Sequence, residues 1–205
     1  INTPQTRDLI SRLNLAAITV LNNKNDVLPL HPDLKEAAIL NVGKPEEIEP
    51  FDRKMKKYTS FARFQLRKDL PEAEQQKLRD SLAAYRRVIV TVTEQRLAPY
   101  QSFFAKFAPE SPVIYVFYTP AKSMLQIQRA VSAAEAVVLA HASRDDVQER
   151  VADLLFGKAT ADGRLSASIG GLFPTGSGVT ITPHTPFHFV PEEYGMKSEV
   201  LRRID

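Results

Sequence analysis

The residues of this chain that could do chemistry lie at the ends of predicted strands. Glu94 follows one strongly apolar run, and His141, Ser143 and Arg144 close another. In open α/β sheets, ligands gather at the carboxyl ends of the strands. A carboxylate held there beside a sugar or a second acid could act as a general acid or base. We therefore take Glu94, His141, Ser143 and Arg144 as candidates for lining a substrate-binding cleft.

Each of these side chains also has a structural explanation. A glutamate directly after a strand can simply begin the next helix, and a histidine there can be held by hydrogen bonds. Ser143 can cap the helix that is predicted to follow it, because its hydroxyl can accept a hydrogen bond from a free N–H at the helix start. The pattern by itself identifies no catalytic residue.

Motifs with a fixed chemistry are absent from the sequence. It contains no cysteine, which excludes disulfides, thiolate zinc sites and a cysteine nucleophile. There is no glycine-rich dinucleotide fingerprint, no phosphate-binding P-loop and no Gly-x-Ser-x-Gly elbow. His184 and His188 are four residues apart, but Pro183 and Pro186 exclude a regular helix that would present both to a metal. We expect no metal site, no cofactor and no self-contained active site.

The composition is that of an ordinary soluble globular chain. Of 205 residues, 43% are hydrophobic and 25% are charged, and the net charge is +3. The basic run at residues 52–58 fits a solvated helix face better than a nucleic-acid patch, because no aromatic residues interleave it for base stacking. No run approaches the roughly 20 apolar residues of a membrane span. Since the chain starts at Ile1 without a signal peptide, we expect an excised fragment.

Apolar runs rich in β-branched residues predict the strands. Near-continuous rather than alternating apolar character is typical of parallel strands that are covered on both faces. Residues 58–64 alternate more and predict a strand nearer the edge of the sheet. The four strong runs are residues 36–42, 87–93, 111–118 and 135–142.

Helical patterns lie between these runs, at residues 71–85, 98–108, 121–131 and 143–157. The last is the clearest, with one apolar face formed by Val147, Val151, Leu154 and Leu155, and with Gly157 ending the helix. Alternating strands and helices predict an α/β fold with right-handed crossovers. The expected architecture is a three-layer α/β/α sandwich with a mostly parallel sheet of five or six strands.

The two ends of the chain give weaker predictions. Residues 3–21 read as an opening helix, followed by a hairpin-like turn at residues 20–30. Residues 170–191 are rich in Gly and Pro and predict a surface tail or linker. The residues of the opening helix that are expected to face the core are Leu9, Leu13, Ala16 and Ala17.

The stretch ADLLFGKATADGRLSASI (residues 152–169) resembles the segment that closes the second, α/β domain of glycoside hydrolase family 3. In that family a helix ends in leucine, an aromatic residue and glycine, and a short loop then leads to Gly-Arg-Leu-Pro before a strand. Ser166 departs from this pattern, since the family usually has proline there. The matching residues are Leu155, Phe156, Gly157, Gly163, Arg164 and Leu165.

Three further stretches resemble the same domain, in the same order along the chain. Residues 14–30 (NLAAITVLNNKNDVLPL) are similar to its opening helix and the turn that follows. Residues 37–43 (AAILNVG) stand where its first strand lies. Residues 113–124 (VIYVFYTPAKSM) are similar to its strand with an aromatic-x-Pro turn.

These resemblances imply a division of the chain. Residues 1–179 would form the second domain of a family 3 enzyme. Residues 190–205 resemble the opening helix of β-lactamase-related serine hydrolases. Residues 180–205 would therefore hold a linker and the start of a C-terminal serine hydrolase-like domain.

The resemblance implies an accessory role in a glycoside hydrolase. The first domain of family 3 is a (β/α)8-type barrel that carries the aspartate nucleophile of a retaining mechanism, and no such barrel fits in this chain. The chain would support that N-terminal barrel in hydrolysing an O-glycosyl bond and would meet carbohydrate through the parent protein. It would supply no catalytic residue. Such enzymes usually act in the periplasm or outside the cell, and we expect the same compartment here.

One segment bears on the branch of the family. Many of its β-glucosidases carry a Glu-Gly-x-Asp-Arg-like segment after a central strand of this domain, which lends a glutamate as acid/base. In the N-acetylglucosaminidase-like branch, a His and an Asp on a barrel loop serve instead. Residues 93–100 (TEQRLAPY) lack the Gly and the Asp. The sequence therefore favours the β-N-acetylhexosaminidase-like branch over the β-glucosidases and leaves Glu94 as the acid to consider for a direct role.

Two other classes of protein remain open. A non-catalytic module could bind carbohydrate or peptidoglycan fragments at its strand ends, and binding by the isolated domain would identify it. A receiver- or flavodoxin-like domain is disfavoured, because residues 41–47 (NVGKPEE) place no cluster of Asp residues at the end of the first strand.

Overall fold

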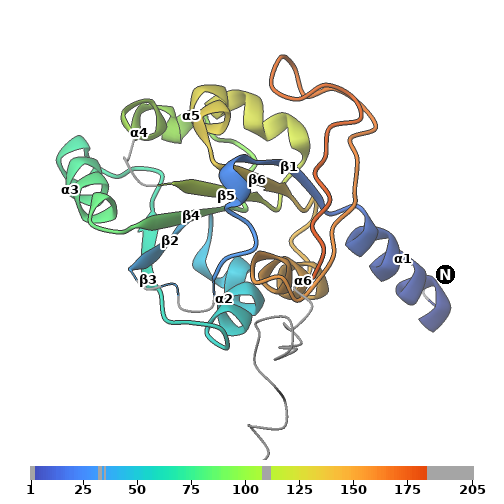
Figure 1. Cartoon of the computed structure of the whole chain (residues 1–205). Coiled ribbons are helices and arrows are strands. Elements are labelled where there is room, and N and C mark those ends of the chain that lie inside the picture. The colour runs from blue at the N-terminus through green and yellow to red at the C-terminus, as the bar shows by residue number, and fades with distance from the viewer. Residues whose placement is uncertain (1–2, 32–33, 35, 108–111, 184–205) are drawn as a thin grey trace, which may run out of the picture.

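The computed structural model describes residues 3–31, 34, 36–107 and 112–183. These residues form a six-stranded sheet with helices on both faces (Figure 1). All strand pairs but one are parallel. The expected three-layer α/β/α sandwich with a mostly parallel sheet is confirmed.

The parallel strands lie at the apolar runs of the sequence. Four of them are buried along almost their whole length, as expected for strands covered on both faces. The fifth, the predicted edge strand, is less buried and begins later than expected, at Ala62. The strands are β2 (Ala37–Val42), β3 (Ala62–Leu66), β4 (Arg87–Val92), β5 (Val113–Phe117) and β6 (Ala136–Leu139).

The start of the chain corrects the prediction of one helix over residues 3–21. Helix α1 (Pro4–Ala16) ends early, and β1 (Thr19–Asn23) pairs antiparallel with β6. Ile18 is 2% exposed and Val20 is completely buried. Side chains branched at Cβ fit a pleated sheet better than a helix. Burial against β6 therefore stabilises a strand here over a continuation of the helix.

Helix α1 does not bury the residues that were expected to face the core. Leu9 is 49% exposed and Leu13 is 61% exposed, and Ala16 and Ala17 are also exposed. Its contacts with the rest of the fold are mainly with α6 (Asp145–Leu155). Figure 1 shows α1 standing out from the body of the domain.

Helices cover both faces of the sheet. Strand residues alternate between two hydrophobic cores, as the pleat requires: Leu40 and Val90 belong to one core, Ile39 and Ile89 to the other. The first core lies under α3 (Glu72–Ala83), α4 (Gln101–Lys106) and α5 (Gln128–Ala133), and the second under α2 (Glu49–Met55) and α6 (Figure 1).

The strand order is β1-β6-β5-β4-β2-β3. From β2 the chain moves outward to β3 and then returns past β2 to β4, so its direction reverses between β2 and β4. The carboxyl ends of the five parallel strands share one edge of the sheet, here called the carboxyl edge. Ligands of open α/β sheets bind outside this edge, at the point of reversal.

Helix α6 differs from its prediction only at its start. Its N-cap is Arg144, and no side chain caps it, so the predicted cap by Ser143 is wrong. The hydroxyl of Ser143 instead donates a hydrogen bond to the carbonyl of Glu47, over 3.2 Å. Gly157 follows the helix with a φ of 64°. The predicted apolar face is confirmed by the full burial of Val147, Val151, Leu154 and Leu155.

Two predicted helices contain 3₁₀ turns. Residues 98–108 hold η3 (Ala98–Tyr100) before α4, and residues 121–131 hold η4 (Ala121–Ile127) before α5. Because side chains three residues apart share a face of a 3₁₀ helix, Met124 and Ile127 of η4 point into the core. Lys122 and Leu125 lie on its exposed side.

The segment expected to be a surface tail in part returns to the sheet. Val179 forms a bridge with Val20 of β1, and Ile181 forms one with Ala161. Ile181 is only 4% exposed. The prediction of a tail is therefore wrong at these positions, because their side chains complete the core beside β1. His184 and His188, and the serine hydrolase-like stretch at residues 190–205, lie outside the described residues.

Gly43 lets β2 and β4 close against each other where the chain reverses direction. Its φ is 140°, and a Cβ on it would lie 1.9 Å from Oγ1 of Thr93. We expect Gly43→Ala to lower the free energy of unfolding by about 2–4 kcal/mol, through backbone strain and overpacking. Gly171→Ala is the matched control, because a Cβ there would meet nothing within 4 Å. Unfolding in urea measures both, and equal effects would contradict the prediction.

Candidate functional site at the carboxyl edge

The carboxyl edge carries the candidate residues, but the sheet keeps them apart. Glu94 follows β4, whereas His141, Ser143 and Arg144 follow β6. Strand β5 lies between β4 and β6. With neighbouring strands about 4.8 Å apart, the backbones of Glu94 and His141 are separated by roughly 10 Å. The four residues therefore line one edge without forming a single reactive cluster.

Glu94 is half-buried and belongs to an acidic corner of the edge. Its Oε1 accepts a hydrogen bond from the backbone N–H of Arg96, over 2.9 Å. Burial, and then the negative charges of Glu94 and Asp69, raise the pKa of the Tyr100 phenol. The charges of two carboxylates, one after β3 and one after β4, therefore act on one phenol. Sequence reasoning missed Asp69 and Tyr100, because the sequence does not show that β3 and β4 both lie beside β2.

His141 has a strained backbone beside a pocket. Its φ is 63°, in the left-handed region where residues other than glycine are uncommon, although His is among the more tolerant. Partial burial lowers the pKa of its imidazole. A neutral imidazole can donate one hydrogen bond and accept another. At neutral pH this ring is therefore suited to contact a hydroxyl group.

The pocket beside His141 has a volume of about 270 Å³ and is closed by β1 and the loop that carries the Gly-Arg-Leu motif. Thr19 and Ser166 are among the residues that line it. Thr19 is only 2% exposed and its hydroxyl donates to the carbonyl of Ala17 over 3.0 Å, so the exposed Ser166 offers the accessible hydroxyl of this wall. Imidazole and hydroxyl groups of this kind form hydrogen bonds with polyols, including sugars.

The Gly-Arg-Leu motif builds this wall. A Cβ on Gly163 would lie 2.5 Å from the carbonyl oxygen of Ile18, so only glycine allows the loop to approach β1. The guanidinium of Arg164 donates to the carbonyls of Asp162 and Gly163, each over 3.0 Å, and to Oγ1 of Thr180 over 2.8 Å. The motif thus has a structural explanation, which is to hold the chain after α6 along the edge strand.

Ser143 and Arg144 brace the start of α6. The amide of Gln148 donates to the carbonyls of Ser143 and Glu47, over 3.2 and 2.8 Å. Arg144 Nε lies 3.1 Å from Oδ1 of Asp146. Burial opposes ionisation of Asp146, but hydrogen bonds from Arg144 and Ser11 hold its pKa below the usual value. These contacts position the loop after β6, and neither residue points to a reaction.

A polar cluster lies between α2 and β3. Arg63 NH1 lies 3.0 Å from Oδ1 of Asp52, and burial raises the pKa of Asp52 against the opposing charge of Arg63. The hydroxyl of Tyr118, after β5, is buried without a hydrogen-bond partner. Burial and the charge of Asp52 raise the pKa of Tyr118. The side chain of Tyr118 is only 3% exposed, so it does not line a cleft.

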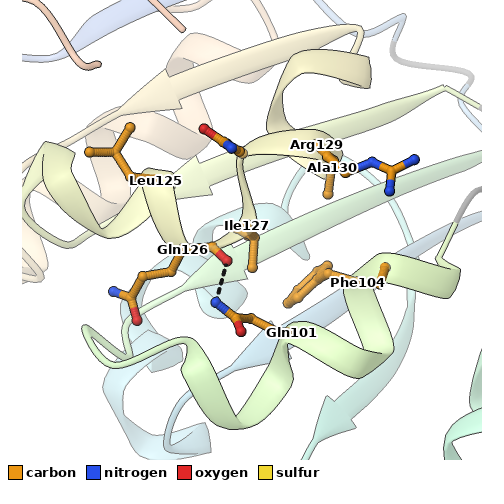
Figure 2. Close-up of a pocket in the computed structure, with 9 residues that line it drawn as sticks. Gln101, Phe104, Leu125, Gln126, Ile127, Arg129 and Ala130 are labelled. Carbon is orange, nitrogen blue, oxygen red and sulfur yellow. Dashed lines mark hydrogen bonds between the residues drawn. The ribbon is translucent and has the colours of Figure 1, made fainter. Parts of the chain in front are cut away.

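A second hollow lies in the helical layer, between α4 and the η4–α5 segment (Figure 2). Its volume is about 280 Å³. The side chains of Phe104 and Ile127 form its floor, and Gln101 and Arg129 belong to its rim (Figure 2). Nothing in the sequence pattern singled out this hollow.

The described residues show neither a candidate metal site nor a helix that could span a membrane. Within them, no three side chains of His, Asp or Glu gather in a way that could hold a metal ion. None of the helices that the structure describes is long and apolar enough to cross a bilayer.

The lowered pKa of His141 makes stability depend on pH. In the unfolded chain this histidine takes up a proton near its ordinary pKa of about 6.5. In the folded protein its pKa is lower, so protonation of the imidazole is still disfavoured at that pH. Its contribution to stability is therefore complete above that pH and is lost as the pH falls through it. Asparagine tolerates a positive φ and does not titrate in this range. We therefore expect His141→Asn to remove this histidine's share of the rise in unfolding free energy between about pH 5 and 7.

Unfolding in urea at several pH values measures this difference. The contributions of the other histidines are the same in both proteins and cancel in the comparison. His141→Val separates charge from strain. Valine should lower the free energy of unfolding further, at every pH, because a side chain branched at Cβ is strained at this φ. An unchanged pH dependence in His141→Asn would contradict the prediction.

No protein-family model and no curated protein matches the sequence. Solved structures do resemble the fold. The chain is similar to a region of a fungal multi-domain GH3 β-N-acetylglucosaminidase, with a TM-score of 0.63 and 16% identity over 87% of this chain and 20% of that one. It is similar to a β-glucosidase from Listeria innocua, with a TM-score of 0.61 and 15% identity over 82% of this chain and 27% of that one.

The β-glucoside phosphorylase BglX is a further neighbour, with a TM-score of 0.55 and 15% identity over 78% of this chain and 31% of that one. The chain therefore spans between a fifth and a third of the length of these three proteins. At such low identity the likeness shows the fold alone. That fold is an α/β sandwich which also occurs as one part of larger proteins that act on β-linked sugars.

Proposed function

We propose that this chain is the second, α/β domain of a family 3 glycoside hydrolase and acts as an accessory domain. The observation that carries the proposal is the agreement of two independent signals. Sequence motifs of that domain occur in order along residues 14–169. A fold like this one forms part of a GH3 β-N-acetylglucosaminidase and covers 87% of this chain.

Helix α1 supports an accessory role. Its Leu9, Ile10 and Leu13 are 49%, 43% and 61% exposed, and none of its residues is buried. An isolated helix of this length is marginal in water, and exposed apolar patches mark interaction sites. Because β1 begins opposite the last residue of β6, α1 enters the fold at the carboxyl edge. We propose that an N-terminal (β/α)8-type barrel packs on this helix and over the edge.

The chemistry of a retaining glycosidase is consistent with this division of labour. It needs two carboxyl groups about 5.5 Å apart on opposite sides of one sugar. In our proposal the barrel supplies the nucleophile, and this chain supplies no catalytic residue. Glu94, His141, Ser143 and Arg144 would then contribute only to the rim of the substrate site, with His141 the best placed to contact a sugar hydroxyl.

Finer assignments belong to the same proposal. The β-N-acetylhexosaminidase-like branch is favoured over the β-glucosidases by residues 93–100, which lack the Gly and Asp of the β-glucosidase segment. We also propose residues 1–179 as the domain, with residues 180–205 as a linker and the start of a serine hydrolase-like domain. The proposed compartment is the periplasm or the exterior of the cell.

A second candidate function is that of a non-catalytic module for carbohydrate or peptidoglycan fragments. The observation that favours it is the pocket beside His141, which the exposed Ser166 also lines. Calorimetry of the 205-residue chain with N-acetylglucosamine oligomers decides between the two. Millimolar or tighter binding that His141→Asn weakens would support the module. If no heat of binding is detected, the accessory-domain function is the one supported.

The proposal predicts where hydrolysis resides. A panel of nitrophenyl glycosides should remain intact with this chain alone. A longer polypeptide that extends upstream of Ile1 into the expected barrel should cleave the N-acetyl-β-glucosaminide. Robust cleavage of any glycoside by the 205-residue chain would overturn the accessory role.

Docking through α1 is tested in the same longer polypeptide. We expect Leu9→Glu with Leu13→Glu to lower kcat/KM at least about tenfold, because charges would replace apolar contacts at the interface of the domains. Arg12→Glu on the same helix is the control and should have little effect, since Arg12 has 71% of its side chain exposed and pairs with Asp8 of the same helix. Equal activities of the two variants would contradict docking through α1.

A direct role of Glu94 is tested by Glu94→Gln. Loss of a general acid or base costs about 10²–10⁴-fold in rate. We expect a change in kcat/KM of less than about threefold, because the proposed chemistry does not use this carboxylate. A loss of a hundredfold or more, with a shifted pH profile, would make Glu94 catalytic and favour the β-glucosidase branch.

A further inference from the structure

The hollow in the helical layer has an apolar floor and positively charged side chains near it. We define the α4–α5 groove as the hollow between α4 and the η4–α5 segment (Figure 2). Phe104 is 3% exposed and Ile127 is 5% exposed, so both floor residues belong to the core. Leu125, at the rim, is 40% exposed. An apolar floor with an exposed apolar rim can receive one more apolar side chain from outside.

Hydrogen bonds hold the groove in shape. The side chain of Gln126 accepts from the backbone N–H groups of Leu97 and Ala98, over 2.8 and 3.1 Å, and donates to the carbonyl of Gln95 over 2.8 Å. The amide of Gln101 donates to the carbonyl of Gln126 over 2.9 Å (Figure 2). These bonds tie η4 to the start of α4, so the groove is largely formed before anything binds.

Of the described residues that line the groove, Arg129 alone is charged. The described residues from 96 to 134 include four cationic side chains and no Asp or Glu. Lys106 pairs with Glu72, 2.8 Å away, and Glu72 also pairs with Arg79. Arg96, Lys122 and Arg129 are exposed, and no ion pair joins them to any residue that the structure describes. The 3₁₀ spacing places Lys122 on the same side of η4 as Leu125.

We propose that the α4–α5 groove is a docking site for an acidic segment of a partner protein that inserts one apolar side chain. Carboxylates of the segment would face Lys122 and Arg129, while its apolar side chain would rest on Phe104 and Ile127. Complementary charge favours encounter and sets orientation, and the floor supplies the apolar contact. No exposed aromatic side chain lines the groove for base stacking, which favours a peptide over a single-stranded nucleic acid.

Fluorescence anisotropy with the complete chain tests the proposal. The probe is a short labelled peptide in which glutamates flank phenylalanines. We expect saturable binding that weakens roughly tenfold in Lys122→Glu with Arg129→Glu, because the steering charges are reversed. Ala105→Trp, at an exposed position of the groove wall, should also weaken binding by filling the groove. A peptide with alanine in place of phenylalanine should bind less tightly.

The matched control is Lys44→Glu with Lys57→Glu, which reverses two exposed cations outside the groove and should change binding by less than about twofold. Equal weakening by the control pair would show non-specific attraction and overturn the proposal. So would preferential binding of a single-stranded oligonucleotide, or a self-association of the chain that the groove variants abolish. Circular dichroism and urea unfolding confirm that each variant is folded. None of these outcomes depends on glycoside hydrolysis.

Discussion

The structure depends on the burial of its parallel sheet on both faces. Strands β2, β4, β5 and β6 expose almost none of their side chains, so helices must cover the sheet above and below. Each crossover between parallel strands supplies one of these helices. This leaves two kinds of surface that are free for function, namely the ends of the strands and the outer sides of the helices.

The few polar groups inside the sheet show how strictly this constraint applies. Asn41 is 3% exposed, but its amide oxygen accepts from Thr91 over 3.1 Å and its amide nitrogen donates to Gln65 over 2.9 Å. Gln65 in turn donates to the carbonyl of Gly43 over 2.7 Å. Buried polar groups satisfied in this way specify one register among three neighbouring strands. They are placed where the chain reverses direction, which steadies the carboxyl edge nearby.

The proposed surfaces of the protein follow from its two free regions. The carboxyl edge holds the pocket of His141 and continues into the apolar side of α1, which suits a large neighbouring domain. The α4–α5 groove lies in the helical layer, and the exposed cations near it suit a smaller acidic segment. Because the two surfaces involve different elements, occupation of one need not block the other.

The sequence by itself determined the parallel strands, the fold class and the apolar face of α6. Continuous apolar runs and helical periodicity are local patterns, and burial on both faces enforces them. Tertiary structure alone decided that residues 19–23 form a strand, since only the edge of β6 makes that conformation better than a longer helix. It also decided that the charges of Asp69 and Glu94 act on the same phenol, that Ser166 shares a pocket with His141, and that α4 and η4 enclose a groove. The residues in each of these groups are far apart in the chain. Strand order and helix packing bring them together, and local sequence patterns contain no information on either.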